Sequence, residues 1–443
     1  MRRITPPMVE IPLYTGGFAD RDILNRSEFA KRLTRLLDCV DEPLVIALDG
    51  DWGSGKSFFL RCWTGAHINE FAGKSQIIYF DAFAKDFLKD PLIGITEALE
   101  ERILAIKGEE GSLRRMKSAL VKLARPALRV AISTMTAGIS EFASPVVAAA
   151  AEEFAKSITD GVDKIWENEK ERTAAIEEFR EGLKSITTLD ENKRNLIFIV
   201  DELDRCRPDY AIDLLEIIKH FFEVPNVHFV LGVNQEELEG NIRHRYGEGT
   251  NSRAYLAKYI NLRMTLPDGT KPIGHHERAA SLQYIRTQAD NMEIDRDFAE
   301  ITYNMALLTN KDISLRDASR LLSIIAINML QKDDMKKLSY GYKYGLAFLI
   351  CLKLFHSYEY RRILSGKFDA EALLKLIDRP STYTGDGFKN LEEVDEAIKH
   401  FTSHERYDGP IAPYLFPRTS NPNPVEFVSL AHHYLETIGD FTT

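Results

Sequence analysis

A glycine-rich octapeptide, Gly50-Asp-Trp-Gly-Ser-Gly-Lys56-Ser57, constrains the fold of this chain more than any other feature. It has every fixed position of the phosphate-binding loop G-x-x-x-x-G-K-[ST]. An apolar run at 44–48 precedes it and a helical pattern at 58–63 follows, which is the strand–loop–helix context that such a loop needs. Successive backbone N–H groups of the loop point at phosphate oxygens, and the helix start adds the positive end of its dipole. The segment therefore predicts a nucleoside-triphosphate site.

The residues of this loop receive separate roles. Lys56 is expected to reach the β- and γ-phosphates, so it also belongs with the catalytic residues. Ser57 is expected to give its hydroxyl to Mg²⁺. The residues assigned to nucleotide binding are Gly50, Asp51, Trp52, Gly53, Ser54, Gly55, Lys56, Ser57 and Phe58.

A second apolar run, residues 195–200, ends in acidic residues. A continuous apolar run is typical of a strand that is buried on both faces of a parallel sheet. Asp201 and Glu202 follow at the C-terminal end of the run, where open α/β sheets bind their ligands. We predict that Asp201 holds the metal ion and that Glu202 orients and polarises the attacking water.

Further apolar runs predict strands at 76–80, 227–233 and 261–266, with an amphipathic helix at 210–222. Strands that alternate with helices predict an α/β fold with a doubly wound parallel sheet. Asn234 follows one of these strands, so we expect its side chain to lie between the loop and the acids. There it would sense the γ-phosphate or position the water, and it is grouped with the catalytic residues.

Composition narrows the class of protein. The chain has 443 residues, enough for about two or three domains. Its formal charge of −10 argues against a protein that simply coats nucleic acid, but it does not exclude a local basic groove. The four cysteines are far apart and predict neither a zinc site nor a disulfide framework. The N-terminus lacks the pattern of a secretory signal, so a reducing cytoplasm is expected.

Several segments together resemble the KAP family of P-loop NTPases. They are the loop 50–57, the acidic block 201–208, and the stretches 214–234 and 255–267. Residues 22–30 resemble the stretch that packs near the adenine in such NTPases, and the resemblance extends over about residues 18–330. It implies ATP and Mg²⁺ as cofactors and, by similarity to AAA+ and STAND proteins, nucleotide-driven assembly. It also implies a homo-oligomer, an effector protein encoded elsewhere and a role in bacterial conflict, such as antiphage defence.

The sequence departs from the family pattern at three places. The family usually has two aspartates where this chain has Asp201 and Glu202, and glutamate is the commoner water-polarising residue in related ATPases. The family's Asn-Ala-Trp after the second strand is Asp81-Ala-Phe83 here. Its usual acidic residue after the fourth strand is Asn234. The first departure favours hydrolysis, and the other two leave the roles of Asp81 and Asn234 open.

The resemblance also implies arginines supplied by a helical lid or by a neighbouring subunit, because a guanidinium stabilises developing phosphoryl charge. Residues 314–322 resemble the lid helix that carries such an arginine. Arg316 and Arg320 are four residues apart and share a helix face, and we favour Arg316 as the catalytic residue. Candidates for an arginine donated in trans are Arg205, Arg243, Arg245 and Arg253.

An insert at about 92–190 separates the two halves of the predicted sheet, at a place where the family often carries transmembrane helices. Residues 112–129 have six Lys or Arg and no acid, and 130–151 are nearly uncharged apart from Glu141. This pattern is typical of a membrane-surface segment. However, the stretch has few large apolar side chains, so we expect a soluble helical hairpin that mediates assembly. A membrane span or a peripheral inner-membrane contact through 112–151 is the alternative.

The chain is thus expected to have a P-loop NTPase sheet, a large helical insert and C-terminal helical parts. The predicted divisions are 1–91 and 191–270 for the NTPase core, 92–190 for the insert, 271–335 for a helical lid and 336–443 for a C-terminal helical domain. The leading functional hypothesis is an oligomerising ATPase switch. The alternatives are a membrane-associated scaffold with little turnover and, less favoured, a motor stimulated by nucleic acid.

Overall fold

The structure is a computed structural model of the chain. It describes residues 3–7, 10–19, 21–88, 90–106, 162–187, 195–267, 277–310, 313–331, 338–368, 370–377, 391–402, 411–416 and 427–435. The segment 112–151, for which we weighed a hairpin against membrane contact, lies outside the described residues.

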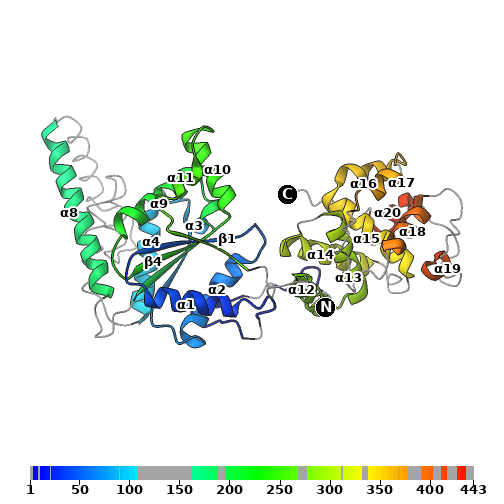
Figure 1. Ribbon diagram of the computed structural model, residues 1–443, viewed down its shortest axis with the longest axis horizontal. Helices are drawn as coiled ribbons and strands as arrows, with labels where there is room; N and C mark the ends of the chain where they lie inside the picture. The colour runs from blue at the N-terminus through cyan, green and yellow to red at the C-terminus, as the bar shows by residue number, and fades with distance from the viewer. Residues whose placement is uncertain are drawn as a thin grey trace, which may run out of the picture.

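Five parallel strands form one sheet in the order β2-β3-β4-β1-β5 (Figure 1). This confirms the predicted parallel α/β fold. In the register, Asp201 lies beside Gly232 and Asp49 lies beside Val233, so the carboxyl ends of β3, β4 and β1 meet at one edge. The strands are β1 (Leu44–Asp49), β2 (Gln76–Asp81), β3 (Leu196–Asp201), β4 (Val227–Val233) and β5 (Leu262–Thr265).

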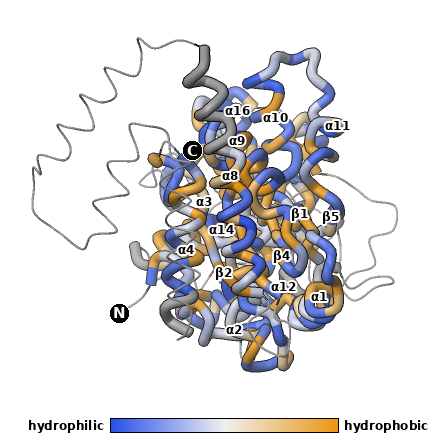
Figure 2. The backbone as a smooth tube through the Cα atoms, turned by 90° about the vertical axis from the view of Figure 1, so that its left-hand side faces the viewer, coloured by the Kyte–Doolittle hydropathy of each residue, from blue (hydrophilic) through white to orange (hydrophobic). Residues whose placement is uncertain are grey.

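Helices cover both faces of the sheet (Figure 2). The strands supply apolar side chains to each face in alternation. Ile197 and Ile199 of β3 pack on the face covered by α1 (Ser27–Cys39) and α2 (Lys56–Asn69). Phe198 and Val200 pack on the opposite face. That face is covered by α4 (Pro91–Ile106), α8 (Val162–Thr187) and α9 (Pro208–Phe221). A strand buried on both faces therefore reads as a continuous apolar run.

The outer edge of β2 is closed by side chains from other segments. The Tyr79 backbone N–H donates to the Tyr14 hydroxyl at 3.1 Å, and Arg102 Nε donates to the Ile77 carbonyl at 3.1 Å. The Arg102 guanidinium also lies 3.9 Å from the centre of the Tyr14 ring. Such contacts satisfy backbone groups that would otherwise invite pairing with another strand.

Short elements follow the carboxyl ends of β2, β3 and β4, and α11 comes after the last of them. They place polar side chains around the edge where β3, β4 and β1 end. They are α3 (Ala82–Lys85), the 3₁₀ turn η1 (Leu203–Arg205), α10 (Gln235–Tyr246) and α11 (Ser252–Leu256).

A second lobe is built only of helices in the described residues from 277 onward (Figure 1). Its core is one hydrophobic cluster that takes residues from both sides of position 335, so the predicted lid and C-terminal helical domain share that core. None of the helices in the described parts of the chain is long and apolar enough to cross a membrane. The helices are α12 (Glu277–Asn291), α13 (Arg296–Thr309), α14 (Leu315–Gln331), α15 (Tyr340–Phe355), α16 (Ser357–Leu364), α17 (Ala370–Leu374), α18 (Leu391–Thr402), α19 (Ala412–Leu415) and α20 (Phe427–Leu435).

The central helix of this helical lobe is α15, which is buried on every side from Gly341 to Leu352. Two of its glycines allow close packing. A Cβ at Gly345 would lie 2.1 Å from the Phe401 ring, and one at Gly341 would lie 2.4 Å from the Phe416 ring. The lobe is therefore held mainly by apolar packing around α15.

Candidate nucleotide site

The loop Gly50–Ser57 connects β1 to α2, as the motif predicts. Two of its glycines have left-handed backbone conformations, with φ of +85° at Gly53 and +87° at Gly55. Residues with a Cβ rarely adopt this conformation, so the loop needs glycine at both positions. Phe58 follows in the first turn of α2 with a side chain that is 37% exposed.

Lys56 is the first residue of α2, and its side chain folds back across the loop. Its ammonium donates to the carbonyl oxygens of Gly50 and, at 3.0 Å, Asp51. Burial lowers the pKa of Lys56, whereas the nearby carboxylates, Asp204 first, raise it. The ammonium therefore lies inside the loop, where a phosphate can replace these carbonyls as its partner.

Asp201 and Glu202 lie at the end of β3, opposite the start of α2. Asp201 is 1% exposed and accepts a 2.7 Å hydrogen bond from the Tyr79 hydroxyl. Burial raises its pKa, while hydrogen bonds from Tyr79 and Ser57 oppose that shift. Across the gap, Ser57 Oγ lies 3.5 Å from Glu202 Oε1. The structure thus brings together the predicted hydroxyl and both predicted carboxylates.

Glu202 has an unusual backbone and a close ionic partner. Its φ is +58°, in the left-handed region that costs energy for a residue with a side chain. Its carboxylate pairs with Arg205 Nη1 at 2.7 Å. Burial raises the pKa of Glu202, and the Arg205 charge lowers it. Arg205, one of the arginines considered for donation in trans, therefore holds the glutamate of its own chain.

The oxygen atoms at this edge fit a magnesium ion that arrives with a nucleotide. Ser57 and Asp201 offer one hydroxyl and one carboxylate, and Mg²⁺ prefers such oxygen ligands. In the described part of the chain, no group of three or more His, Cys, Asp or Glu side chains is placed to hold a metal. Proteins commonly bind Mg²⁺ through one or two side chains, with phosphates and water completing the shell.

Trp52 ties the middle of the loop to the acidic segment. Its indole N–H donates to Asp204 Oδ2 at 2.6 Å, although the two residues are 152 positions apart. Asp204 lies in η1, three positions after Asp201, and is 6% exposed. The sequence placed Trp52 in the nucleotide-binding set without revealing this partner.

The start of α14 brings Arg316 beside the loop. A Cβ at Gly53 would lie 2.9 Å from Arg316 Cβ and 2.9 Å from Ser314 Oγ. Ser314 and Asp317 form a capping box: the Asp317 N–H donates to Ser314 Oγ, and the Ser314 N–H donates to Asp317 Oδ2, both at 3.2 Å. Arg320 pairs with Asp317 at 3.6 Å, whereas among the described residues no ion pair of Arg316 is found.

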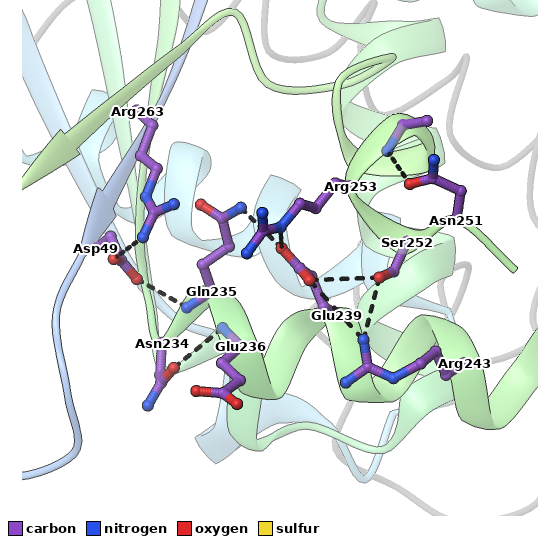
Figure 3. A network of polar contacts seen from close by, with 11 residues as sticks. Asp49, Asn234, Gln235, Glu236, Glu239, Arg243, Asn251, Ser252, Arg253 and Arg263 are labelled. Atoms are coloured by element: carbon purple, nitrogen blue, oxygen red, sulfur yellow. Dashed lines mark hydrogen bonds and ion pairs between the residues drawn. The ribbon is translucent and has the colours of Figure 1, made fainter. Parts of the chain in front are cut away.

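Asn234 follows β4 and caps α10, with its side-chain oxygen accepting from the Glu236 N–H at 3.1 Å. Because β4 lies between β3 and β1, Asn234 lies between the strand that ends in the acids and the one that leads into the loop. Figure 3 shows the polar network around it. Asp49, the residue before the loop, accepts from the Gln235 N–H at 2.8 Å and pairs with Arg263 at 2.6 Å.

The remaining arginines considered for donation in trans are all engaged within the chain. Glu239 lies between Arg253 Nε at 3.3 Å and Arg243 Nη1 at 3.8 Å (Figure 3). Arg245 pairs with Asp213 at 3.0 Å and Asp209 at 3.3 Å. The Arg253 side chain is 80% exposed, against 32% for Arg243 and 29% for Arg245. Of these three, Arg253 is the most accessible to another molecule.

One residue at the site, Arg26, was missed by the sequence reasoning as a contact of the loop. It is 5% exposed, and its guanidinium donates to the Ser54 carbonyl at 2.9 Å and the Pro267 carbonyl at 2.7 Å. In a trans peptide the Gly55 N–H points in the opposite direction to the Ser54 carbonyl. Because Arg26 holds that carbonyl, it also fixes the direction of the Gly55 N–H, which points away from Arg26. The only signal in the sequence was its place at the start of α1, in the stretch that resembles an adenine-proximal segment.

A phosphate-binding loop between a parallel strand and a helix, facing a carboxylate pair on a neighbouring strand end, defines a P-loop NTPase. The KAP family P-loop domain matches residues 26–330, more than half of the chain. The protein therefore belongs to the KAP family.

Comparisons outside this family give weaker similarities. No curated protein matches the sequence significantly. Two solved structures of the Aeropyrum pernix ORC2 protein are similar over most of their length. The one with ADPNP–ADP complexes is 12% identical, covers 93% of this chain and 88% of that chain, and has a TM-score of 0.32. The ADP form is 14% identical, covers 90% and 87%, and has a TM-score of 0.29.

Proposed function

We propose that this KAP family protein binds ATP with Mg²⁺ and hydrolyses it to ADP and phosphate. The observation that carries the proposal is the meeting of the loop with the carboxylates of β3, where Ser57 Oγ lies 3.5 Å from Glu202 Oε1. Lys56 lies inside the same loop with its ammonium on backbone carbonyls. A phosphate chain laid along the loop would thus have its terminal group beside Glu202.

Each residue has a distinct part in this proposal. The loop N–H groups and Lys56 bind the phosphates, and Ser57 and Asp201 hold the metal. When bound, Mg²⁺ neutralises phosphate charge and orients the β- and γ-groups. Glu202 orients the attacking water, and Asn234, at the end of β4 between β3 and β1, offers its amide N–H₂ as a hydrogen-bond donor.

Arg316 is the proposed stabiliser of the charge that develops on the γ-phosphate. Its Cβ lies beside Gly53, and it makes no ion pair within the described residues. A guanidinium without a carboxylate partner beside a phosphate loop suits an anionic group. Because Arg316 belongs to the helical lobe, a bound nucleotide would hold that lobe against the loop, and release of phosphate would loosen this contact, which would act as a conformational switch.

The biological part of the proposal comes from the family resemblance alone. We propose that the nucleotide state controls homo-oligomer formation and an effector protein encoded elsewhere, in a bacterial conflict system such as antiphage defence. Arg253, the most exposed of the arginines near α10, is the preferred candidate for donation to a neighbouring subunit. Fold alone does not define such a role.

A scaffold that binds ATP with little turnover is the second candidate. The observation that favours it is the 2.7 Å pair between Glu202 and Arg205, because a carboxylate held by a guanidinium is less available to water. Membrane association through 112–151 belongs to this second candidate. A nucleic-acid-stimulated motor is distinguished from both by measuring turnover with added DNA or RNA.

The proposal is tested by Mg²⁺-dependent ATP turnover of the purified protein beside Glu202→Gln and Lys56→Ala. We expect the wild type to hydrolyse ATP, Glu202→Gln to bind ATP without turnover and Lys56→Ala to bind ATP much more weakly. A wild type that binds ATP but shows no turnover at high concentration would overturn hydrolysis by this chain alone and favour the scaffold.

A further inference from the structure

The hydrogen bond between Trp52 and Asp204 joins the two sides of the candidate metal site. Ser57 belongs to the loop side and Asp201 to the strand side. We propose that Trp52 is a positioning residue whose bond to Asp204 fixes the separation of these two sides, and thereby the fit of the metal ion between them. The proposal rests on the proposed Mg²⁺–nucleotide site and assigns to Trp52 a role that the loop motif does not define.

The geometry makes the bond a strong one. The indole N–H and the carboxylate oxygen are 2.6 Å apart, and hydrogen bonds to ionised groups are shorter and stronger than neutral ones. Asp204 is 6% exposed, so little water competes for its carboxylate. Trp52 is 41% exposed, so packing holds its ring only in part. Within the described residues, the bond to Asp204 is the polar contact that fixes the ring.

Asp204 is itself held by the sheet lobe. It belongs to η1, which packs on α10, and its backbone carbonyl accepts from Asn241 Nδ2 at 3.3 Å. It is also the carboxylate that most raises the pKa of Lys56. Trp52, by contrast, lies in a loop beside Gly53, which contacts the start of α14. The bond therefore attaches a loop that contacts the helical lobe to η1, next to Asp201.

Metal binding is the step most sensitive to this separation. Mg²⁺ requires nearly ideal octahedral geometry, with oxygens at about 2.0–2.1 Å. A shift of a few tenths of an ångström between the loop and β3 therefore weakens the metal ion's contribution. Phosphates alone are bound by backbone N–H groups and Lys56, all of which belong to the loop side. Loss of the bond should thus reduce the gain in affinity from Mg²⁺ and leave metal-free binding nearly unchanged.

The test measures the affinity of the full chain for a non-hydrolysable ATP analogue, with Mg²⁺ and with a chelator. The ratio of the two dissociation constants gives the gain from the metal. Trp52→Phe keeps an aromatic ring and loses the N–H, while Asp204→Asn keeps an oxygen acceptor and loses the charge. Trp63→Phe is the matched control, because Trp63 donates a 2.9 Å bond to Thr34 in the core, away from the site.

We expect Trp52→Phe to lower the gain from Mg²⁺ by about tenfold while metal-free affinity stays within about twofold. Asp204→Asn should lie between Trp52→Phe and the wild type, and the double variant should match Trp52→Phe alone. The gain should be unchanged in Trp63→Phe. An unchanged gain in Trp52→Phe, or an equal loss with and without metal, would overturn the proposal.

This readout does not depend on turnover. If the wild type fails to hydrolyse ATP but Trp52→Phe loses the gain from Mg²⁺, the proposed ATPase activity is wrong and the positioning role stands. If turnover is present and the gain is unchanged in both Trp52→Phe and Asp204→Asn, the positioning role is wrong and the ATPase proposal stands.

Discussion

The sheet lobe and the helical lobe both have apolar cores, but they differ in the charged groups that they bury. At the carboxyl ends of the strands, Asp201 is 1% exposed and Lys56 is 8% exposed, and burial lowers the pKa of Lys56 while the carboxylates of Asp204 and Asp201 raise it. In the helical lobe, α15 is surrounded by apolar side chains and approaches its neighbours through Gly341 and Gly345. A partly buried ion pair, Lys343 with Asp295 at 3.2 Å, joins α15 to the start of α13.

This difference indicates which residues bind the ligand and which residues determine the stability of the fold. Buried charges cost free energy unless they are paired, so an edge that concentrates them is suited to a charged ligand. Apolar packing contributes to stability in proportion to buried area and carries no such chemistry. Substitutions at the strand ends should therefore change binding or turnover, and substitutions around α15 should change stability.

The largest effect is expected at Lys56. Lys56→Ala removes a charge-assisted contact to phosphate and should weaken ATP binding by about 30- to 100-fold, measured by titration with a fluorescent ATP analogue. Lys85→Ala is the control, because Lys85 pairs with Glu97 on the surface at 3.0 Å and should leave the affinity unchanged. Equal losses in both variants would contradict a specific phosphate contact.

The second-largest effect should be a loss of stability in the helical lobe. Gly345→Ala places a methyl group about where Phe401 lies and should lower the free energy of unfolding by about 1 to 3 kcal/mol. Circular dichroism in guanidinium measures this change. Gly249→Ala, where a Cβ meets nothing within 4 Å, is the matched control. Loss of ATP affinity in folded Gly345→Ala would break the division between the lobes.

Arg316 tests the point where the two lobes meet. Arg316→Ala should slow ATP turnover by at least about tenfold, because a positive charge near the γ-phosphate is lost, with ATP affinity changed much less. Arg320→Ala removes a neighbouring arginine that already pairs with Asp317, and its turnover should stay near that of the wild type. Equal turnover in all three proteins would exclude Arg316 from catalysis.

The smallest expected effect is a loss of stability of the sheet lobe at acidic pH. Burial lowers the pKa of His67 and of His228 below their ordinary value of 6.5, and both lie in the sheet lobe. Below that value the unfolded chain binds protons that the folded lobe does not, so stability should fall as pH falls. Each histidine should contribute less than about 1 kcal/mol between pH 7 and pH 6.

Tryptophan fluorescence during unfolding measures the stability of the sheet lobe. The three tryptophans of the chain belong to that lobe: Trp52 lies in the loop, Trp63 in α2 and Trp166 in α8. A sheet lobe that is equally stable at both pH values would contradict the assigned cause.

The sequence predicted the sheet lobe in more detail than the helical lobe. The strands were found within one or two residues, because runs such as 196–200 are apolar throughout and end at turns or charges. Asp201 was predicted to follow its strand but is the last residue of β3, since it still lies beside Gly232 of β4 in the register. The loop motif placed Lys56 and Ser57 directly, because their neighbours in the sequence are also their neighbours in space.

Contacts between distant segments could not be predicted in this way. Arg26 meets Ser54 and Pro267, and Trp52 meets Asp204, only after the order of the strands brings these segments together. In the helical lobe, the sequence predicted a C-terminal helical domain over 336–443 but not that Gly345 lies against Phe401. Periodicity shows which side of a helix is apolar, and it does not show which helix covers that side.

The most direct test is hydrogen exchange of the full chain with and without a non-hydrolysable ATP analogue and Mg²⁺. We expect new protection at the loop 50–57, at 201–205 after β3 and at the start of α14, with no change in the core of the helical lobe around α15. Protection confined to the helical lobe, or none at the loop, would contradict the assignment of the sheet edge as the nucleotide site.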